Sequence, residues 1–103
     1  MKYLVYIFCD AGVTTRILVN KMMEIVYEND LPLEIEAHSI ANAEEHVKNK
    51  APNLIILGPQ VKYLEPKIKL QFAPVEVVSF DTETFASADA ATAVKKIINL
   101  LRQ

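Results

Sequence analysis

The chain has 103 residues, of which 51% are hydrophobic and 23% charged, and its 11 basic and 13 acidic residues give a formal net charge of −2. This length and composition predict one globular domain that spans residues 1–103. The near balance of charges, with no basic block, argues against a nucleic-acid partner. No apolar stretch approaches the roughly 18 residues that a transmembrane helix needs, so direct membrane insertion is not expected.

The apolar stretch at the N-terminus is short, and Asp10 follows where a signal peptide would have small residues around its cleavage site. We therefore expect a cytoplasmic protein. The only cysteine, Cys9, cannot form an internal disulfide, and His38 and His46 share no ligand spacing with it. The sequence thus predicts neither a metal site nor a cofactor.

Three elements are predicted in the first part of the chain. Lys2 to Phe8 is apolar at almost every position, which is typical of a central strand in a parallel sheet. From Thr15 the spacing changes to that of a helix, which ends near Asn29. Its apolar face consists of Leu18, Met22, Ile25 and Val26. Leu33 to His38 alternates apolar and polar residues, which indicates a strand with one exposed face at an edge of the sheet.

The middle of the chain predicts two more strands and a short helix. Asn42 is followed by Glu45 at the spacing of a helix-start cap, which predicts a short helix to about Lys50. Asn53 to Leu57 is a second strand that is apolar on both faces, and Val75 to Ser79 is the fourth strand.

Pro66 divides the segment from Val61 to Phe72 into a loop and a short helix, because proline breaks a helix interior. The last helix has the apolar stripe Ala90, Val94, Ile97, Ile98 and Leu101. The order β-α-β-α-β-α-β-α with right-handed crossovers predicts an α/β fold, a four-stranded parallel sheet in the order 2-1-3-4 with helices on both faces. Such sheets bind ligands where the strand order reverses, here at the carboxyl ends of strands one and three.

Cys9 lies at this position. A lone cysteine in a small domain is usually a buried small hydrophobe. Here, however, Asp10 to Arg16 are predicted to form a loop leading into a helix N-terminus, where unpaired backbone N–H groups stabilise a thiolate and hold phosphate oxygens. Gly12 would either let the backbone approach a bound anion or simply make a tight turn. Thr14 and Thr15 add hydroxyl donors, and one of them is expected to cap the helix.

Each of three further residues near this edge has two interpretations. Arg16 would either pair with a phosphoryl group or be a solvated residue of the first helical turn, and the second is favoured. A carboxylate at Asp10, next to Cys9, opposes thiolate formation and repels phosphate unless it points outward. His38 ends strand two at the same edge, where an exposed edge-strand histidine is the simpler description.

Two segments together resemble the IIB component of the lactose/cellobiose-type sugar phosphotransferase system. These are "CDAGVTT" after the first strand and "LGPQVKYLEP" after the third. Members carry a cysteine, small residues, a glycine and hydroxyl residues in the first loop. In the second loop they carry glycine, proline and glutamine, with a tyrosine and a proline downstream. Gly58, Pro59, Gln60, Tyr63 and Pro66 fit, and the similarity extends over essentially the whole chain.

The resemblance implies that Cys9 accepts a phosphoryl group from a histidine of the IIA protein and passes it to a sugar of the cellobiose, lactose or chitobiose type. The sugar is bound by the membrane permease IIC, which would hold the protein at the inner face of the membrane. The implied phosphate-binding loop comprises Asp10, Ala11, Gly12, Val13, Thr14, Thr15 and Arg16. The implied wall for partner docking comprises Gly58, Pro59, Gln60 and Tyr63, and Tyr63 could equally serve packing. Asp10 and Arg16 depart from the family, which usually has small or polar residues there.

Other proteins with this fold also use a loop thiol or a phosphate site. Low-molecular-weight tyrosine phosphatases and arsenate reductases need an arginine at the position of Thr15, and Arg16 comes one residue too late. They also need an acid, for which Asp81 and Asp89 lack a convincing context. A receiver domain wants an aspartate where strand three ends at Leu57, and a flavodoxin-like domain would be longer.

Overall fold

The structure, a computed structural model, describes residues 2–10, 13–81 and 89–102, with the backbone alone at positions 13 and 14. The strands are β1 (Tyr3–Cys9), β2 (Leu33–Ser39), β3 (Leu54–Leu57) and β4 (Glu76–Ser79). The α-helices are α1 (Val13–Glu28), α2 (Ala43–Asn49), α3 (Glu65–Phe72) and α5 (Ala90–Leu101), and two 3-10 helices, η1 (Ile40–Asn42) and η2 (Pro59–Leu64), precede α2 and α3.

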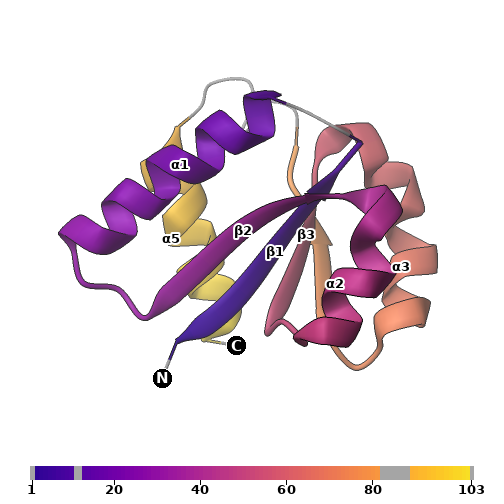
Figure 1. The fold of residues 1–103 in the computed structure, drawn as a ribbon. Coiled ribbons are helices and arrows are strands. Elements are labelled where there is room, and N and C mark those ends of the chain that lie inside the picture. The colour runs from indigo at the N-terminus through magenta and orange to yellow at the C-terminus, as the bar shows by residue number, and fades with distance from the viewer. Residues whose placement is uncertain (1, 11–12, 82–88, 103) are drawn as a thin grey trace.

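The four strands form one parallel sheet in the order β2-β1-β3-β4, which confirms the predicted topology. α1 and α5 cover one face of the sheet, and α2 and α3 cover the other (Figure 1). The two strands that are apolar on both sides, β1 and β3, are central because both of their faces are covered. The alternating strand β2 is at an edge, as its pattern predicts. In the described part of the chain, no helix has the length and apolarity needed to cross a bilayer.

Successive residues of the central strands point to opposite faces and so build two apolar clusters. Val5 and Ile7 pack with residues of α1 and α5, whereas Leu4, Tyr6 and Phe8 pack with residues of α2, η2 and α3. Both clusters consist of fully or almost fully buried side chains. The sheet therefore holds the carboxyl end of β1 in place from both sides.

Helix starts differ most from the predictions. α1 begins at Val13, so Thr14 and Thr15 are helical and neither is the cap, because a cap residue lies outside the helix. Asn42 precedes α2 but makes no side-chain capping bond. Instead, the Ser39 hydroxyl accepts a hydrogen bond from the Ala41 N–H and caps η1, which leads directly into α2.

The segment after β3 is also more regular than predicted. η2 takes the place of the expected loop, and Pro66 lies in the first turn of α3, where its missing N–H removes no helical hydrogen bond. Proline thus starts this helix, as the predicted break implies, and the residues before it form a 3-10 helix.

Candidate functional site

Cys9 is the last residue of β1, and its Cα pairs with that of Ser39 at the end of β2. The residue is buried, with 4% of its surface exposed. Strand alternation places it on the face of Val5 and Ile7, toward α1. Cys9 is therefore a buried thiol at the carboxyl end of a central strand.

The segment after Cys9 is shorter than the predicted loop. Asp10 forms an exposed bend, and the backbone from Val13 to Arg16 is already the first turn of α1. The predicted positions Ala11 and Gly12 lie outside the described residues. The start of α1 lies at the same edge of the sheet as the carboxyl end of β1 (Figure 1). The first turn of α1, whose N–H groups have no partner within the helix, therefore lies at the edge that carries Cys9.

Two polar side chains of the first turn of α1 are described, and they differ in their exposure to solvent. Thr15 is buried, and Arg16 is exposed to solvent. The solvated interpretation of Arg16 is therefore the one that its exposure supports. Thr15 lies on the buried side of α1 and is not its cap.

Ser39 is a residue of this edge that the sequence reasoning missed. Its hydroxyl donates to the backbone carbonyl of Asp10 at 3.4 Å and accepts from the Ala41 N–H at 3.3 Å. It therefore links the residue after Cys9 to the start of η1. The available signal was the parallel register, which places the last residue of an edge strand beside the end of its neighbour.

The second predicted segment begins beside β1. Gly58 is buried, and its N–H donates to the Phe8 carbonyl at 2.9 Å, one residue before Cys9. Its dihedral angles, φ −66° and ψ 161°, are those of extended backbone that any residue adopts. The Gly58 carbonyl in turn accepts from the Val61 N–H at 3.1 Å, which starts η2. The strand end and the second segment are therefore joined directly.

The exposed side chains of this second segment face solvent. Tyr63 is 77% exposed, so it does not serve packing, and Gln60 is also exposed. Pro59 is half-buried at the first turn of η2. These three residues and Gly58 follow β3 at the same edge of the sheet as Cys9.

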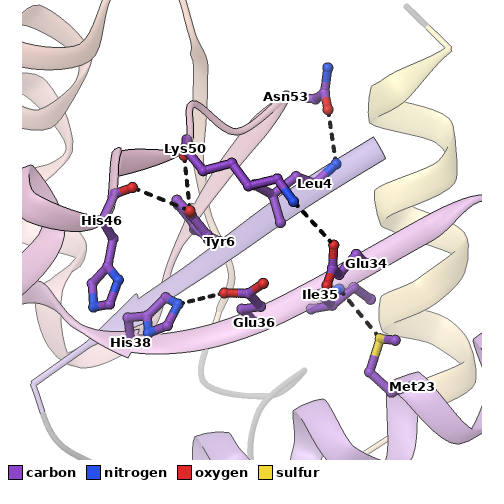
Figure 2. A network of polar contacts seen from close by, with 10 residues as sticks. All are labelled: Leu4, Tyr6, Met23, Glu34, Ile35, Glu36, His38, His46, Lys50 and Asn53. Carbon is purple, nitrogen blue, oxygen red and sulfur yellow. Dashed lines mark hydrogen bonds and ion pairs between the residues drawn. The ribbon is translucent and has the colours of Figure 1, made fainter. Parts of the chain in front are cut away.

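His38 is not the exposed histidine that the sequence predicts. It is half-buried, its ring stacks on that of His46 with centroids 3.6 Å apart, and its Nε2 lies 2.9 Å from Glu36 Oε1. Figure 2 shows this pair beside Tyr6, whose hydroxyl donates to the carbonyls of His46 and Lys50. Burial raises the pKa of Tyr6, with Glu36 and Glu34 adding to the effect. This network joins β2 to α2 on the face opposite Cys9.

The residues at this edge of the sheet are suited to holding an anionic group. A thiol at the end of a central strand, next to a helix start, can hold a covalently bound anionic group among backbone N–H groups. Within residues 2–10, 13–81 and 89–102, no group of three or more histidine, cysteine, aspartate or glutamate side chains is placed to bind a metal ion.

Similarity to known proteins agrees with this geometry. The family model described as "PTS system, Lactose/Cellobiose specific IIB subunit" matches residues 4–97. The galactose-specific EIIB component of the PTS system of Lactococcus lactis subsp. cremoris (strain MG1363) is 31% identical over 77 residues, which cover 68% of this chain and 71% of that protein. The cellobiose-specific EIIB component of Lactococcus lactis subsp. lactis (strain IL1403) is 30% identical over 77 residues, with the same coverage of 68% and 71%.

Two solved structures have the same fold. The lactose-specific IIB component domain of the phosphoenolpyruvate:carbohydrate phosphotransferase system from Streptococcus pneumoniae superposes with a TM-score of 0.81 at 16% identity, covering 96% of this chain and 97% of that one. The cellobiose-specific phosphotransferase IIB component from Borrelia burgdorferi gives a TM-score of 0.77 at 17% identity, covering 99% and 94%. Because the family model spans nearly the entire sequence, the chain belongs to the lactose/cellobiose-specific IIB family of the sugar phosphotransferase system.

Proposed function

We propose that this protein is a phosphoryl carrier that accepts a phosphoryl group on Cys9 from a phosphohistidine of the IIA protein and passes it to a sugar bound by the IIC permease. The observation that carries the proposal is the position of Cys9. It ends a central strand at the edge where α1 begins, and it is the only thiol in the chain. Residues 1–103 would act as one IIB-type domain.

Two transfers make up the proposed cycle. Cys9 loses its proton, and its thiolate sulfur attacks the phosphorus of phosphohistidine. The S–P bond forms as the N–P bond breaks, and the departing imidazole nitrogen takes up a proton. In the second transfer a sugar hydroxyl oxygen attacks the same phosphorus. The O–P bond forms, sulfur leaves as a thiolate, and the hydroxyl proton is released to solvent.

The chain's own contribution is to position the group and stabilise its charge. Backbone N–H groups from Asp10 to Arg16 would surround the phosphoryl oxygens, with Thr14 and Thr15 as additional donors. The exposure of Arg16 supports a site that relies on backbone donors rather than on a cationic clamp. A carrier benefits from this weaker hold, because a strongly stabilised phosphocysteine would not be passed on.

The partners follow from the two transfers. IIA would dock at the edge that carries Cys9 and the wall of Gly58, Pro59, Gln60 and Tyr63. IIC would use the same edge in turn and hold the protein at the cytoplasmic face of the membrane. The sugar would be of the cellobiose, lactose or chitobiose type, and it would be recognised by IIC rather than by this chain.

The proposal is tested by intact-mass measurement after incubation with phosphorylated IIA. We expect the wild-type chain to gain the mass of one phosphoryl group and Cys9→Ala to gain none, while both give the same circular dichroism spectrum. A panel of IIA donors shows which donor is used. Equal labelling of the two proteins would remove Cys9 from its role.

The same preparation distinguishes a carrier from a thiol phosphatase. We expect no steady hydrolysis of an aryl phosphate by the isolated chain. One acid candidate for such hydrolysis, Asp89, is engaged at the start of α5, where it accepts hydrogen bonds from the Thr92 N–H and hydroxyl. Sustained turnover that is lost in Cys9→Ala would contradict the carrier assignment.

A further inference from the structure

Glu65 makes a short side-chain hydrogen bond to Ser79, and it lies where η2 passes into α3. Its Oε1 accepts a hydrogen bond from the Ser79 hydroxyl at 2.5 Å, and its Oε2 lies 3.3 Å from Lys69 Nζ. The side chain is 30% exposed. The Ser79 hydrogen bond lowers the pKa of Glu65, and Lys69 and Lys62 lower it further. At neutral pH Glu65 is therefore a charged acceptor, which makes the stronger kind of hydrogen bond.

Ser79 belongs to the sheet at the level where the segment that starts at Gly58 begins. It is the last residue of β4 and pairs with Leu57, and the following N–H, that of Phe80, donates to the Leu57 carbonyl at 3.0 Å. Leu57 immediately precedes Gly58, which is hydrogen-bonded to Phe8. A continuous set of contacts thus runs from the Glu65 carboxylate across β4 and β3 to the residue before Cys9.

The segment from Gly58 to Leu64 is therefore held at both ends. Gly58 fixes its start against β1, and Glu65 fixes its end against β4. Between these anchors the backbone is a 3-10 helix, whose internal hydrogen bonds are weaker than those of an α-helix. Val61 is its one buried residue, and Gln60 and Tyr63 face solvent. The two anchors act together with the packing of Val61 and Leu64 on the cluster below to set the orientation of this segment.

We infer that Glu65 is a positioning residue for partner-dependent phosphoryl transfer, because its hydrogen bond to Ser79 fixes the orientation of the wall, Gly58 to Tyr63, that a partner contacts. The inference rests on the proposed function. Glu65 acts through the wall and does not touch the reacting atoms. Loss of its hydrogen bond should weaken recognition of the partner while leaving the reactivity of the thiol unchanged.

The test compares Glu65→Ala, Ser79→Ala and the double variant in transfer from phosphorylated IIA. We expect KM for the carrier to rise roughly five- to tenfold in each single variant, which is the size expected for the loss of one typical net hydrogen bond. The value of kcat should stay within about twofold of wild type. The double variant should be no worse than Glu65→Ala alone, because both substitutions remove the same contact.

Three controls separate positioning from loss of structure. Lys69→Ala removes the exposed ion pair but keeps the Ser79 contact, so its KM should remain within about twofold of wild type. Glu65→Gln keeps an acceptor oxygen and should recover part of the loss. The rate at which iodoacetamide alkylates Cys9 should be equal in all variants. If Glu65→Ala does not fold, Ser79→Ala carries the test, because it removes only the hydroxyl.

Two results would overturn the inference. One is an unchanged KM in both single variants, and the other is a parallel fall in kcat and in Cys9 alkylation, which would indicate general damage. Failure of the proposed function gives a different result, since wild-type protein would then take no phosphoryl group on Cys9. In that case, the amide shifts of residues 58 and 60–63 in Ser79→Ala still show whether the hydrogen bond orients the wall, and unchanged shifts would count against it.

Discussion

At the residue scale, the Tyr6 hydroxyl completes the end of α2. It donates to the Lys50 carbonyl at 2.9 Å and to the His46 carbonyl at 3.3 Å, although Tyr6 is far from both in sequence (Figure 2). The His46 carbonyl also accepts a hydrogen bond from the Lys50 N–H at 3.0 Å, which closes the last turn of the helix. The Lys50 carbonyl lies beyond this turn, and Tyr6 donates to it. A buried tyrosine of β1 thus attaches the end of α2 to the central strand.

Tyr6→Phe should lower the free energy of unfolding by about 1 kcal/mol, because it removes the hydrogen bond from the buried Tyr6 side chain to the Lys50 carbonyl. Urea titration followed by circular dichroism measures the change. Tyr27→Phe is the matched control, since Tyr27 is exposed and its replacement should have an effect below about 0.5 kcal/mol. Equal losses in the two variants would show that the hydroxyl of Tyr6 adds nothing to stability.

The same phenol predicts a pH dependence. Burial and the nearby glutamates raise the pKa of Tyr6 in the folded protein above its ordinary value of 10.0. Its contribution to stability is therefore complete below about pH 10 and is lost as pH rises through the folded pKa. We expect the stability difference between wild type and Tyr6→Phe to narrow above about pH 10, and a difference that stays constant to pH 11 would contradict this.

At the element scale, Asp89 starts α5. Its Oδ1 accepts from the Thr92 N–H at 3.2 Å and its Oδ2 accepts from the Thr92 hydroxyl at 2.6 Å. Both bonds lower the pKa of Asp89. Asp89→Ala should reduce the thermal midpoint by a few degrees, whereas Asp89→Asn keeps an acceptor and should retain most of the stability. Asn99→Ala, an exposed change on the same helix, is the control.

The pH dependence of this cap has the opposite sign to that of Tyr6. A lowered pKa means that the contribution of Asp89 is present above about pH 4 and is lost as pH falls through the folded value. The difference in midpoint between wild type and Asp89→Ala should therefore shrink in acid. If it grew instead, the charged form of Asp89 would not be the one that caps α5.

The sequence predicted strands better than it predicted helix starts, for a physical reason. Strand type follows from how many faces are apolar, which is visible in runs such as Leu54–Leu57, so the sheet order was predictable. Which residue caps a helix depends on where the helix begins. The observed start of α1 at Val13 lies two residues before the predicted start at Thr15, so Thr14 and Thr15 are inside the helix. A capping pattern in the sequence can also fail because another residue supplies the cap. Here Ser39 caps η1, which leads into α2, and Asn42 makes no capping bond.

The contacts that fix the candidate site were harder to predict than its residues. Cys9 and Gly58 were predicted from their places at strand ends, and the structure joins their segments through the Gly58–Phe8 hydrogen bond. The link between Glu65 and Ser79 joins residues on different elements, so it has no local signal. Such contacts become visible only once the parallel register brings separate strand ends together.

At the scale of the whole molecule, the two apolar clusters share the same strands. In β3, Ile55 belongs to the cluster under α2 and α3, and Ile56 belongs to the cluster under α1 and α5. Both side chains are fully buried. Neither cluster can come apart without displacing β1 and β3, and this displacement would expose the other. The chain should therefore unfold as one cooperative unit, as small domains usually do.

Cooperativity is tested by following backbone amide signals of α1 and α5 and those of α2 and α3 separately through one urea titration. Ile55→Ala and Ile56→Ala should each cost about 2–5 kcal/mol, because each leaves a cavity in a close-packed cluster. Each should lower the midpoint of both helix pairs equally, whichever face it touches.

Leu70→Ala, a control at an exposed position of α3, should leave both midpoints in place. If Ile55→Ala released α2 and α3 at a lower urea concentration than α1 and α5, the two faces would be independent. The edge that carries Cys9 would then lose the support of one helix layer while keeping that of the other.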